Sequence, residues 1–598
     1  MNQGTMSRAG KPGDERPPTG IVPSAVWQFV ALAAIVVAAY WPSFSVPFYL
    51  DDYHNIVENP RLHDVTNWQA IWEFAPQRFV GSLTLAFNHA VHGPEVWGYH
   101  LVNALIHLMA GFALWALLAA IVRSPAVDRS ARPWLLWLPL IGAAIFLLHP
   151  LQTQAVTYIV QRYASLAAMF YLSSLAAYAW GRLHGSRPLL LAALILAALA
   201  VFTKQNAVTV FPALLLTELL FFRSLDRRGV ALLVAAAAGA SAILLWLTNF
   251  EAIDGMLRET SDISRSSYFA TQVGVLWRYV LLFVLPTDQR LEYDIALATD
   301  PFSPAVMVAA GAHLAVLTGA LLLWRRAPLV AFGILFFYLA HLVESSVFPI
   351  SDLAFEHRTY LPNAGLAILA ALGLLWLTSH GNRNLVIAAG AAVVLGVLGW
   401  LTFERNRLWQ DPIAFLQADA RLSPEKERAW TSLGKELMRR ERFEEALDAL
   451  GKALNLGRTE DGLEVSVPTL LNTVYALHYT GQHRKGFRLA GVIPVKELSP
   501  LDLSRLLEVR GMALAQLRRP KLARRELDRA FQAYPNPNTL AWIAYVDLIE
   551  NQPDAAAERA AEVLESVPDH PLARDILDQA EALRDAQAET PPRQGVSD

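Results

Sequence analysis

Residues 25–60 read AVWQFVALAAIVVAAYWPSFSVPFYLDDYHNIVENP, so an apolar run is followed closely by two adjacent carboxylates. An apolar run of about 20 residues is long enough to cross a bilayer as a helix. Asp51 and Asp52 then lie in an aromatic loop beside the membrane. Two such acids repel each other and lose solvation, which is typical of a site for a cation, a proton or a sugar hydroxyl. The alternative is that they cap a loop helix in water.

The composition is that of a membrane protein. Of the 598 residues, 54% are hydrophobic and only 17% are charged, which is too apolar for a soluble chain of this length. The net charge of -3 gives no reason to expect a nucleic acid partner. The chain has no cysteine, which excludes disulfides, thiolate catalysis and Cys-ligated metals. The polar residues 1–24, rich in Gly and Pro, are expected to form a disordered cytoplasmic tail.

Apolar runs recur to about residue 402 and predict a helical membrane domain over residues 25–404 with about eleven spans. The predicted spans are 25–45, 98–122, 134–149, 164–181, 188–203, 206–222, 230–250, 302–324, 327–345, 360–380 and 385–402. A further apolar run, 268–286, contains Arg278. We expect it to be a re-entrant or interfacial helix, because an arginine in lipid is costly.

The orientation follows from the arginines of the short loops. With eleven spans, they all fall on the cytoplasmic side: Arg123, Arg129, Arg132, Arg182, Arg187, Arg223, Arg227, Arg228, Arg325, Arg326 and Arg383. The large loop 46–97 and everything after residue 402 then face outward. The chain is therefore expected to be a multi-pass protein of an inner, cytoplasmic membrane, with this loop and the C-terminal region on the periplasmic or outer face.

Residues 405–586 predict a helical repeat domain. A unit of about 34 residues recurs with large and small residues where two antiparallel helices interlock, which is the pattern of a tetratricopeptide repeat. The clearest positions are Trp430, Gly434, Ala446, Ala453, Gly511, Ala523, Ala530 and Pro535. Such repeats stack into an α-solenoid that holds peptides or proteins, although a spacer or self-association module fits as well. Residues 587–598 are expected to be disordered.

Polar residues gather at the predicted outer ends of the spans. They are His149, Arg162, Lys204, Gln205, Glu356, His357 and Arg358, on the same side as the acid pair. Cations near a carboxylate suit a phosphate-linked sugar, because the cations hold the phosphate leaving group and the carboxylate takes the acceptor proton. Taken one at a time, each cation could also be an interfacial residue. His100, Asn103 and His107 share one helix stripe, where interhelical hydrogen bonds are more common than ligands.

These segments occur in an order that resembles a known family. The pieces are FYLDDYHNIVENP, YHLVNALIHL, HPLQTQAVTYIVQR, FTKQNAVTV, EHRTYLPNAG and ERNRLWQDPIAFLQADARLSP, followed by the repeats. They are similar to the transmembrane and tetratricopeptide-repeat protein O-mannosyltransferases and their bacterial relatives, polytopic glycosyltransferases of the GT-C class. The resemblance covers about residues 25–580.

The resemblance implies an all-α GT-C-type bundle, a lipid-phosphate sugar donor, and inverting transfer to an acceptor on the outer face. The family's acidic motif maps to Asp51 and Asp52, and its basic motifs map to Arg162, Lys204 and Arg358. This chain departs from the family in two places. The family usually has Lys-Glu where this chain has Lys204-Gln205, and Glu-Arg where this chain has Glu356-His357-Arg358. His357 is therefore a second candidate phosphate contact. The absence of cysteines and the small size favour a bacterial enzyme and a polyprenyl carrier.

The sequence hypothesis is a glycosyltransferase that moves a sugar, expected to be a hexose, from polyprenyl phosphate to a hydroxyl of a protein held by the repeats. Asp52 is favoured over Asp51 as the base, because it is more embedded in the aromatic surroundings. His149, Gln205 and Glu356 are candidate contacts to acceptor or sugar. No cofactor is required, and a divalent cation such as Mg²⁺ or Mn²⁺ stays open. Two alternatives remain: an oligosaccharyltransferase or O-antigen-ligase-like enzyme with a lipid-diphosphate donor, and a non-enzymatic envelope scaffold.

Overall fold

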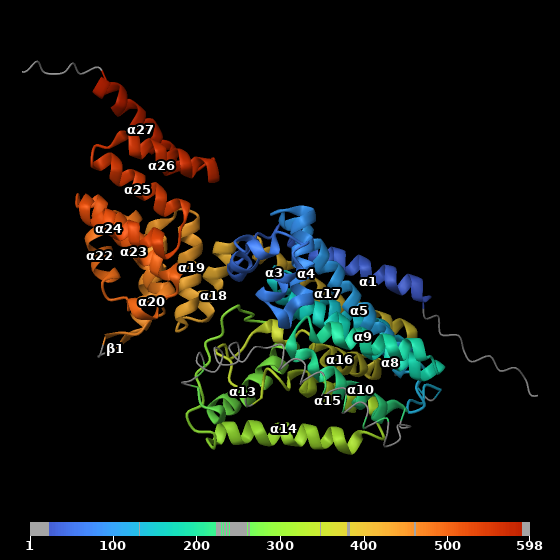
Figure 1. The fold of residues 1–598 in the computed structure, drawn as a ribbon. Helices are drawn as coiled ribbons and strands as arrows, with labels where there is room; N and C mark the ends of the chain where they lie inside the picture. Colours follow the sequence, from blue (N-terminus) through green and yellow to red (C-terminus); the bar gives the residue numbers. More distant parts are fainter. Residues whose placement is uncertain are drawn as a thin grey trace, which may run out of the picture. The chain divides into compact units, whose positions relative to one another are not determined.

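The computed structural model describes residues 23–130, 132–222, 263–346, 348–378, 383–459 and 462–588, together with isolated positions between 229 and 260. The chain divides into two compact units, Met1–Pro412 and Ile413–Asp598 (Figure 1). In the described part, the regular structure is helical apart from one short antiparallel pair, β1 (Arg458–Thr459) with β2 (Gly462–Leu463). The predicted all-α class is confirmed.

The first unit is a bundle of apolar helices around α5 (Val96–Ile121). This helix packs against α6 (Leu138–Leu148) and α8 (Arg162–His184), and α6 packs in turn against α16 (Asn363–Leu377). The close approach of α5 to α6 depends on Gly111, because a Cβ there would lie 2.5 Å from the Leu147 side chain. The surrounding helices are α1 (Ala25–Tyr40), α4 (Phe79–His92), α9 (Arg187–Val201), α10 (Val210–Thr217), α13 (Arg265–Val284), α14 (Pro304–Leu323), α15 (Pro328–His341) and α17 (Arg383–Trp409).

Several of these helices can span a membrane. Among the described residues, five helical segments are long and apolar enough, or six if the bent pair Pro133–Leu148 and Pro150–Val156 is one span. The predicted number of about eleven stays a prediction, because three other predicted spans form apolar helices of only 14–15 residues. The predicted span 230–250 lies outside the described residues. Arg265–Val284, predicted to be re-entrant or interfacial, is a continuous 20-residue helix that is long and apolar enough to cross.

The second unit is a stack of helical hairpins, drawn in orange to red in Figure 1. After α18 (Pro412–Leu422) come α19 (Glu427–Arg439), α20 (Phe443–Leu456), α21 (Val467–Tyr479), α22 (His483–Ala490), α23 (Pro500–Gln516), α24 (Pro520–Ala533), α25 (Pro537–Ile549), α26 (Pro553–Ser566) and α27 (Pro571–Ala588). Each helix from α19 on packs against the next, and the first helix of each hairpin also packs against the first helix of the following one. This is the stacking of tetratricopeptide repeats, so the predicted α-solenoid is confirmed.

Candidate active site

The acid pair lies in a tight turn directly after the first apolar helix. The turn is the short helix α2 (Leu50–Asp52), and Leu50 before the acids has a φ of 28°, which a bulky residue rarely adopts. Asp52 is buried, and its Oδ2 accepts the backbone N–H of Tyr49 at 2.9 Å while its Oδ1 accepts that of Val160 at 2.7 Å. Asp51 is exposed, and its backbone N–H donates to the Tyr158 hydroxyl at 2.9 Å. The two neighbouring acids therefore have different surroundings.

Burial dominates the electrostatics of Asp52 and raises its pKa to about 8. The two backbone amides oppose this shift, the charge of Asp51 adds to it, and the charge of Arg162 opposes it. Burial also raises the pKa of the Tyr158 hydroxyl well above its ordinary value, and the charges of Asp51 and Asp52 add to that rise. Tyr158 is therefore a neutral hydroxyl beside Asp51.

A second polar group surrounds Lys204, in the turn between α9 and the helix that begins at Gln205. The buried Lys204 Nζ lies 2.7 Å from Glu344 Oε1. Burial lowers the pKa of Lys204, Glu344 opposes this effect, and the positive charges of Arg78 and Arg358 add to it. Arg358 is buried, donates to the backbone O of Asp352 at 2.8 Å and hydrogen-bonds the Tyr268 hydroxyl. We call Arg78, Lys204, Glu344, His357 and Arg358 the cation cluster.

His357 belongs to this cluster as a neutral ring. Burial, and then the charges of Lys204, Arg358 and Arg78, lower its pKa well below the ordinary value. Its backbone N–H donates to Gln154 Oε1 at 2.6 Å, and its ring stacks on Phe355. The sequence-predicted phosphate contacts Lys204, His357 and Arg358 are therefore brought together.

Unpaired polar atoms concentrate around the same cluster. Within the described parts of the chain, seven buried side-chain atoms near it have no hydrogen-bond partner: Gln154 Nε2, Gln205 Oε1, His341 Nδ1, His341 Nε2, Glu344 Oε2, Ser345 Oγ and His357 Nδ1. Buried polar atoms in proteins are nearly always paired, so each exception calls for a reason. Their gathering beside three cations is typical of a place that binds a polar, anionic ligand.

One short segment, residues 150–161, contacts both the acid turn and the cation cluster. It includes α7 (Thr153–Val156), which packs against the short helix Glu356–Thr359, and Ile159–Gln161, which packs against α2. Gln154 bonds His357, whereas Tyr158 bonds Asp51 and Val160 bonds Asp52. Gln154 lies in α7, and Tyr158 follows two residues after the end of that helix. The acids and the cations thus share one wall.

Arg162, the third predicted cation, is placed differently. It is fully buried, and its guanidinium donates to Asn103 Oδ1 at 2.5 Å, Asn88 Oδ1 at 2.7 Å, and the backbone O atoms of Thr84 and Tyr99 at 3.1 Å. These bonds join α4, α5 and α8 beneath the acid turn. Arg162 is not in the cation cluster, and its charge acts on Asp52 instead.

Glu356 and His149, two predicted sugar or acceptor contacts, are also occupied by the protein. Glu356 accepts from Gln289 Nε2 at 3.1 Å, the Arg290 backbone N–H at 2.7 Å and the Tyr293 hydroxyl at 2.8 Å. His149 Nε2 bonds the Phe283 backbone O at 2.8 Å, and its ring stacks on Phe283. Both residues therefore anchor α13 and the loop that follows it. Gln205, the third, is half-buried and keeps its unpaired Oε1 beside Lys204.

The polar stripe of α5 is occupied by hydrogen bonds to the protein; those of Asn103 to α7 and of His107 to α6 are interhelical, as predicted, whereas Val46, the partner of His100, lies outside the helices. His100 bonds the Val46 backbone O at 2.8 Å, Asn103 bonds Val156 O at 2.9 Å, and His107 bonds the Tyr360 hydroxyl at 2.7 Å. Among the described residues, no group of three or more His, Asp or Glu could hold a metal ion.

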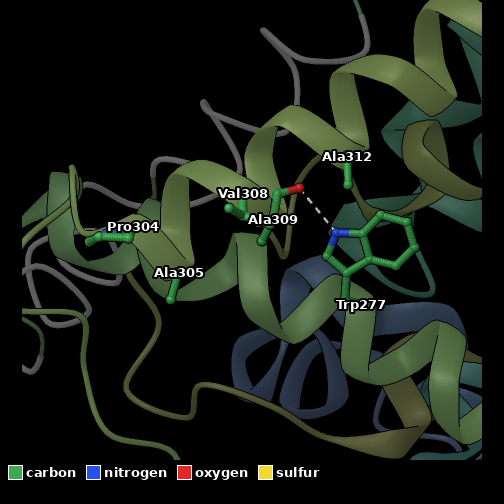
Figure 2. A pocket seen from close by; sticks show the side chains of 6 residues that line it. All are labelled: Trp277, Pro304, Ala305, Val308, Ala309 and Ala312. Carbon is green, nitrogen blue, oxygen red and sulfur yellow. Dashed lines mark hydrogen bonds between the residues drawn. The ribbon is translucent and has the colours of Figure 1, made fainter.

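An apolar groove lies between α13 and the start of α14 (Figure 2). It is lined by Trp277 of α13 and by Pro304, Ala305, Val308, Ala309 and Ala312 at the start of α14. The Trp277 indole N–H donates to the Ala309 backbone O at 3.1 Å and fixes the two helices. Trp277 is nine residues from Tyr268, about 180° around the helix, whereas Tyr268 bonds Glu344 O. The groove is therefore on the opposite face of α13 and does not belong to the candidate site.

Sequence reasoning missed Arg78 and Glu344. Glu344 stands inside the predicted span 327–345, where an acid is costly and points to a function, so this signal was present in the sequence. Arg78 is an exposed residue at the end of the short helix Pro76–Arg78, and its sequence neighbours gave no such signal; its guanidinium lies over the Tyr163 ring at 5.3 Å.

Together, the fold and the site define a multi-pass helical membrane protein with tetratricopeptide repeats and a polar site of acids and cations. No family model matches the chain. The chain is 24% identical over 463 residues to the protein O-mannosyl-transferase Tmtc1 of Drosophila melanogaster, which covers 61% of this chain and 52% of that protein. It is 21% identical to the protein O-mannosyl-transferase TMTC3 of Mus musculus, covering 73% of this chain and 53% of that protein.

A shorter match, 31% identical, relates 28% of this chain to 19% of the protein O-mannosyl-transferase Tmtc2 of Drosophila melanogaster. The chain thus resembles the protein O-mannosyl-transferases over most of its length, which confirms the predicted resemblance. It spans about half the length of the first two relatives. The crystal structure of the APC/C hetero-tetramer Cut9–Hcn1 aligns with 73% of this chain and 90% of that chain at 16% identity, with a TM-score of 0.26, which is too low to indicate a shared fold.

Proposed function

We propose that this protein is a glycosyltransferase that moves a sugar from a lipid-phosphate donor to a hydroxyl of a protein acceptor on the outer face of the membrane. The observation that carries the proposal is the cation cluster, with its unpaired buried polar atoms, on the same segment as the acid turn. The names of the relatives indicate mannose as the sugar and a protein as the acceptor.

The cation cluster holds the donor phosphate. Arg78, Lys204 and Arg358 supply positive charge where the bond between the anomeric carbon and the phosphate oxygen breaks, and the leaving phosphate keeps the electron pair. Glu344 orients Lys204 through their 2.7 Å contact. Burial in a region of low dielectric strengthens the interactions of Lys204 and Arg358, whereas Arg78 is exposed.

The acid turn activates the acceptor. The acceptor oxygen attacks the anomeric carbon from the side opposite the phosphate, which inverts the configuration, and a carboxylate takes its proton. We assign this role to Asp51, because it is exposed beside Tyr158, whereas both oxygens of Asp52 are occupied by backbone N–H groups. Asp52 then positions the turn, together with Arg162. This assignment exchanges the roles that the sequence favoured.

The outward orientation and the carrier are supported by the sequence. The arginine-rich loops support an outward-facing acid turn, because cytoplasmic loops usually carry the positive charge. A polyprenyl phosphate is the carrier expected for a bacterial enzyme. The repeat unit offers a surface for the acceptor protein.

The test compares Asp51→Asn with Asp52→Asn in membranes, with polyprenyl-phosphate mannose and a Ser/Thr-containing acceptor protein. We expect Asp51→Asn to lower turnover at least about 100-fold with unchanged thermal stability, and Asp52→Asn to change stability as well. Lys204→Met is expected to raise the donor KM. If both asparagine variants turn over normally at normal expression, the proposal is wrong.

A further inference from the structure

The charge of the exposed stripe on the second helices of the hairpins changes sign along the repeat unit. The second helices of the four hairpins align at a buried small residue, which is Ala446, Gly486, Ala523 or Ala556. Relative to that residue, the exposed positions two before and two after are Glu444 and Asp448 in α20, Arg484 and Arg488 in α22, Lys521 and Arg525 in α24, and Asp554 and Glu558 in α26. The order along the stack is therefore acidic, basic, basic, acidic.

The basic part of this stripe is larger than four residues. Residues 484–529 contain 12 Lys or Arg and 5 Asp or Glu. Exposed neighbours on the same two hairpins are Lys485, Arg518 and Arg519. Within the described ranges, none of Arg484, Lys485, Arg488, Arg518, Arg519, Lys521 and Arg525 has an ion-pair partner. Their charges are therefore available to a ligand.

The helices α22 and α24 lie next to each other. Phe487 of α22 packs into the hydrophobic cluster that contains Ala523 and Leu527 of α24. Arg510 of α23 links them too, because its guanidinium lies 5.7 Å from the Phe487 ring and its Nε lies 3.4 Å from Glu526 Oε2. Since the basic positions are equivalent in the two repeats, they form one continuous face, which we call the basic face.

Exposed aliphatic side chains interrupt the basic face. Leu522 lies between Lys521 and Arg525 and is 48% exposed, and Val492, four residues after Arg488, is 64% exposed. A surface that combines free cations with exposed aliphatic groups differs from an ordinary solvated face, where charges of both signs are mixed. It offers a partner both charge and apolar contact.

The acidic flanks distinguish between two kinds of anionic partner. Glu444 and Asp448 on one side and Glu558 on the other have no ion pair in the described part of the unit, whereas Asp554 pairs with Arg584. A lipid leaflet is a continuous negative surface and would also meet these acids. A short polypeptide segment can be confined to two helices on the same side of the stack.

We infer that the basic face of α22 and α24 binds an acidic polypeptide segment with one or two apolar side chains, and that this segment belongs to the protein acceptor. The second part rests on the proposed function. An extended segment of about six residues spans about 20 Å and covers both helices. The partner chemistry is therefore glutamate and aspartate around an aliphatic anchor.

The experiment uses the full chain in nanodiscs of neutral phosphatidylcholine. The probe is a fluorescein-labelled eight-residue peptide of glutamates with one central leucine, followed by fluorescence anisotropy. We expect saturable binding that weakens with added salt. Arg488→Glu with Arg525→Glu is expected to raise Kd at least about tenfold. The matched control, Arg421→Glu with Arg574→Glu, makes the same charge change elsewhere on the unit and is expected to leave Kd unchanged.

A second experiment distinguishes binding of an acidic peptide from binding of an anionic lipid leaflet. Because the chain has no cysteine, Val492→Cys gives a single labelling site for a fluorophore in nanodiscs with nitroxide lipids. Quenching that requires anionic lipid, without peptide binding, would overturn the inference in favour of a membrane surface. Peptide binding that is unaffected by the charge reversal would overturn it as well. Neither readout depends on catalysis, so failure of the proposed enzyme activity is distinguishable.

Discussion

The contact between Lys204 and Glu344 predicts how Glu344→Gln responds to pH: as the pH rises, donor binding should weaken and the fold should become more stable. Two unit charges 2.7 Å apart attract by about 6 kcal/mol at an effective dielectric constant of about 20. Part of this energy offsets the desolvation of both groups. In Glu344→Gln the attraction is lost, while Lys204 stays buried. Removing one partner of a buried pair costs about 3–5 kcal/mol if the lysine stays charged, so the expected response is loss of its proton.

The sign of the effect follows from linkage. Burial already lowers the pKa of Lys204, and Glu344 opposes that lowering, so Glu344→Gln lowers it further. Between the lowered pKa of the folded state and the ordinary lysine value of 10.5, the unfolded chain keeps a proton on Lys204 that the folded protein has lost. The folded protein therefore becomes more stable as the pH rises across that range. Lys204, a member of the proposed phosphate site, loses its charge as the pH passes its lowered pKa. The donor KM should therefore rise with pH while the thermal midpoint also rises.

Both quantities can be measured on one preparation. Transfer from polyprenyl-phosphate mannose is followed against donor concentration from acidic to alkaline pH, and unfolding is followed by intrinsic fluorescence. Glu404→Gln is the control, because the Glu404–Arg407 pair is exposed, with 40% and 60% of its side chains accessible, and such pairs contribute about 0–1 kcal/mol. A donor KM of Glu344→Gln that stays flat with pH, at normal folding, would refute the reasoning.

Three further changes test other parts of the membrane and repeat units. Arg162→Met removes four donated hydrogen bonds and leaves Asn103 and Asn88 without them, so a loss of about 3–5 kcal/mol is expected in denaturant unfolding; a shift below about 1 kcal/mol would contradict this. Gly511→Ala places a Cβ 2.5 Å from Leu527, and calorimetry should show a loss of about 1–3 kcal/mol in the repeat unit. Burial raises the pKa of Asp52 from 3.8 to about 8, so its protonated form stabilises the fold at low pH and this contribution is lost progressively as the pH rises from 3.8 to about 8; Asp52→Asn should flatten that part of the stability profile.

The fold class and the repeat unit could be predicted because they depend on local patterns. Apolar runs, interlocking small residues such as Gly434 and Gly511, and the loop arginines are all read within one segment of sequence. Lys204 and Arg358 were found for a similar reason, since each is a cation at the end of an apolar run. The lengths of the shorter helices were not readable, because packing inside the bundle decides where α15 and α16 end.

The surroundings of individual polar residues could not be predicted, because their partners are distant in sequence. Arg162 is satisfied by Asn88 and Asn103, which are 74 and 59 residues away. Glu356 is satisfied by the loop that contains Arg290 and Tyr293, 66 and 63 residues away. Tertiary contacts of this kind decide whether a charged side chain is free to bind a ligand or serves to anchor the fold.

For the proposed reaction, the charge of the cation cluster favours a lipid-monophosphate donor over a lipid-diphosphate donor. Arg78, Lys204 and Arg358 with Glu344 leave two positive charges, since burial and the neighbouring cations keep His357 neutral. A sugar linked to a lipid monophosphate carries one negative charge, and the phosphate that leaves carries close to two near neutral pH. The cluster therefore gains most when the bond to the sugar breaks, which is the condition for catalysis by charge stabilisation. A leaving diphosphate would carry further negative charge that these side chains do not balance, so we favour the monophosphate donor.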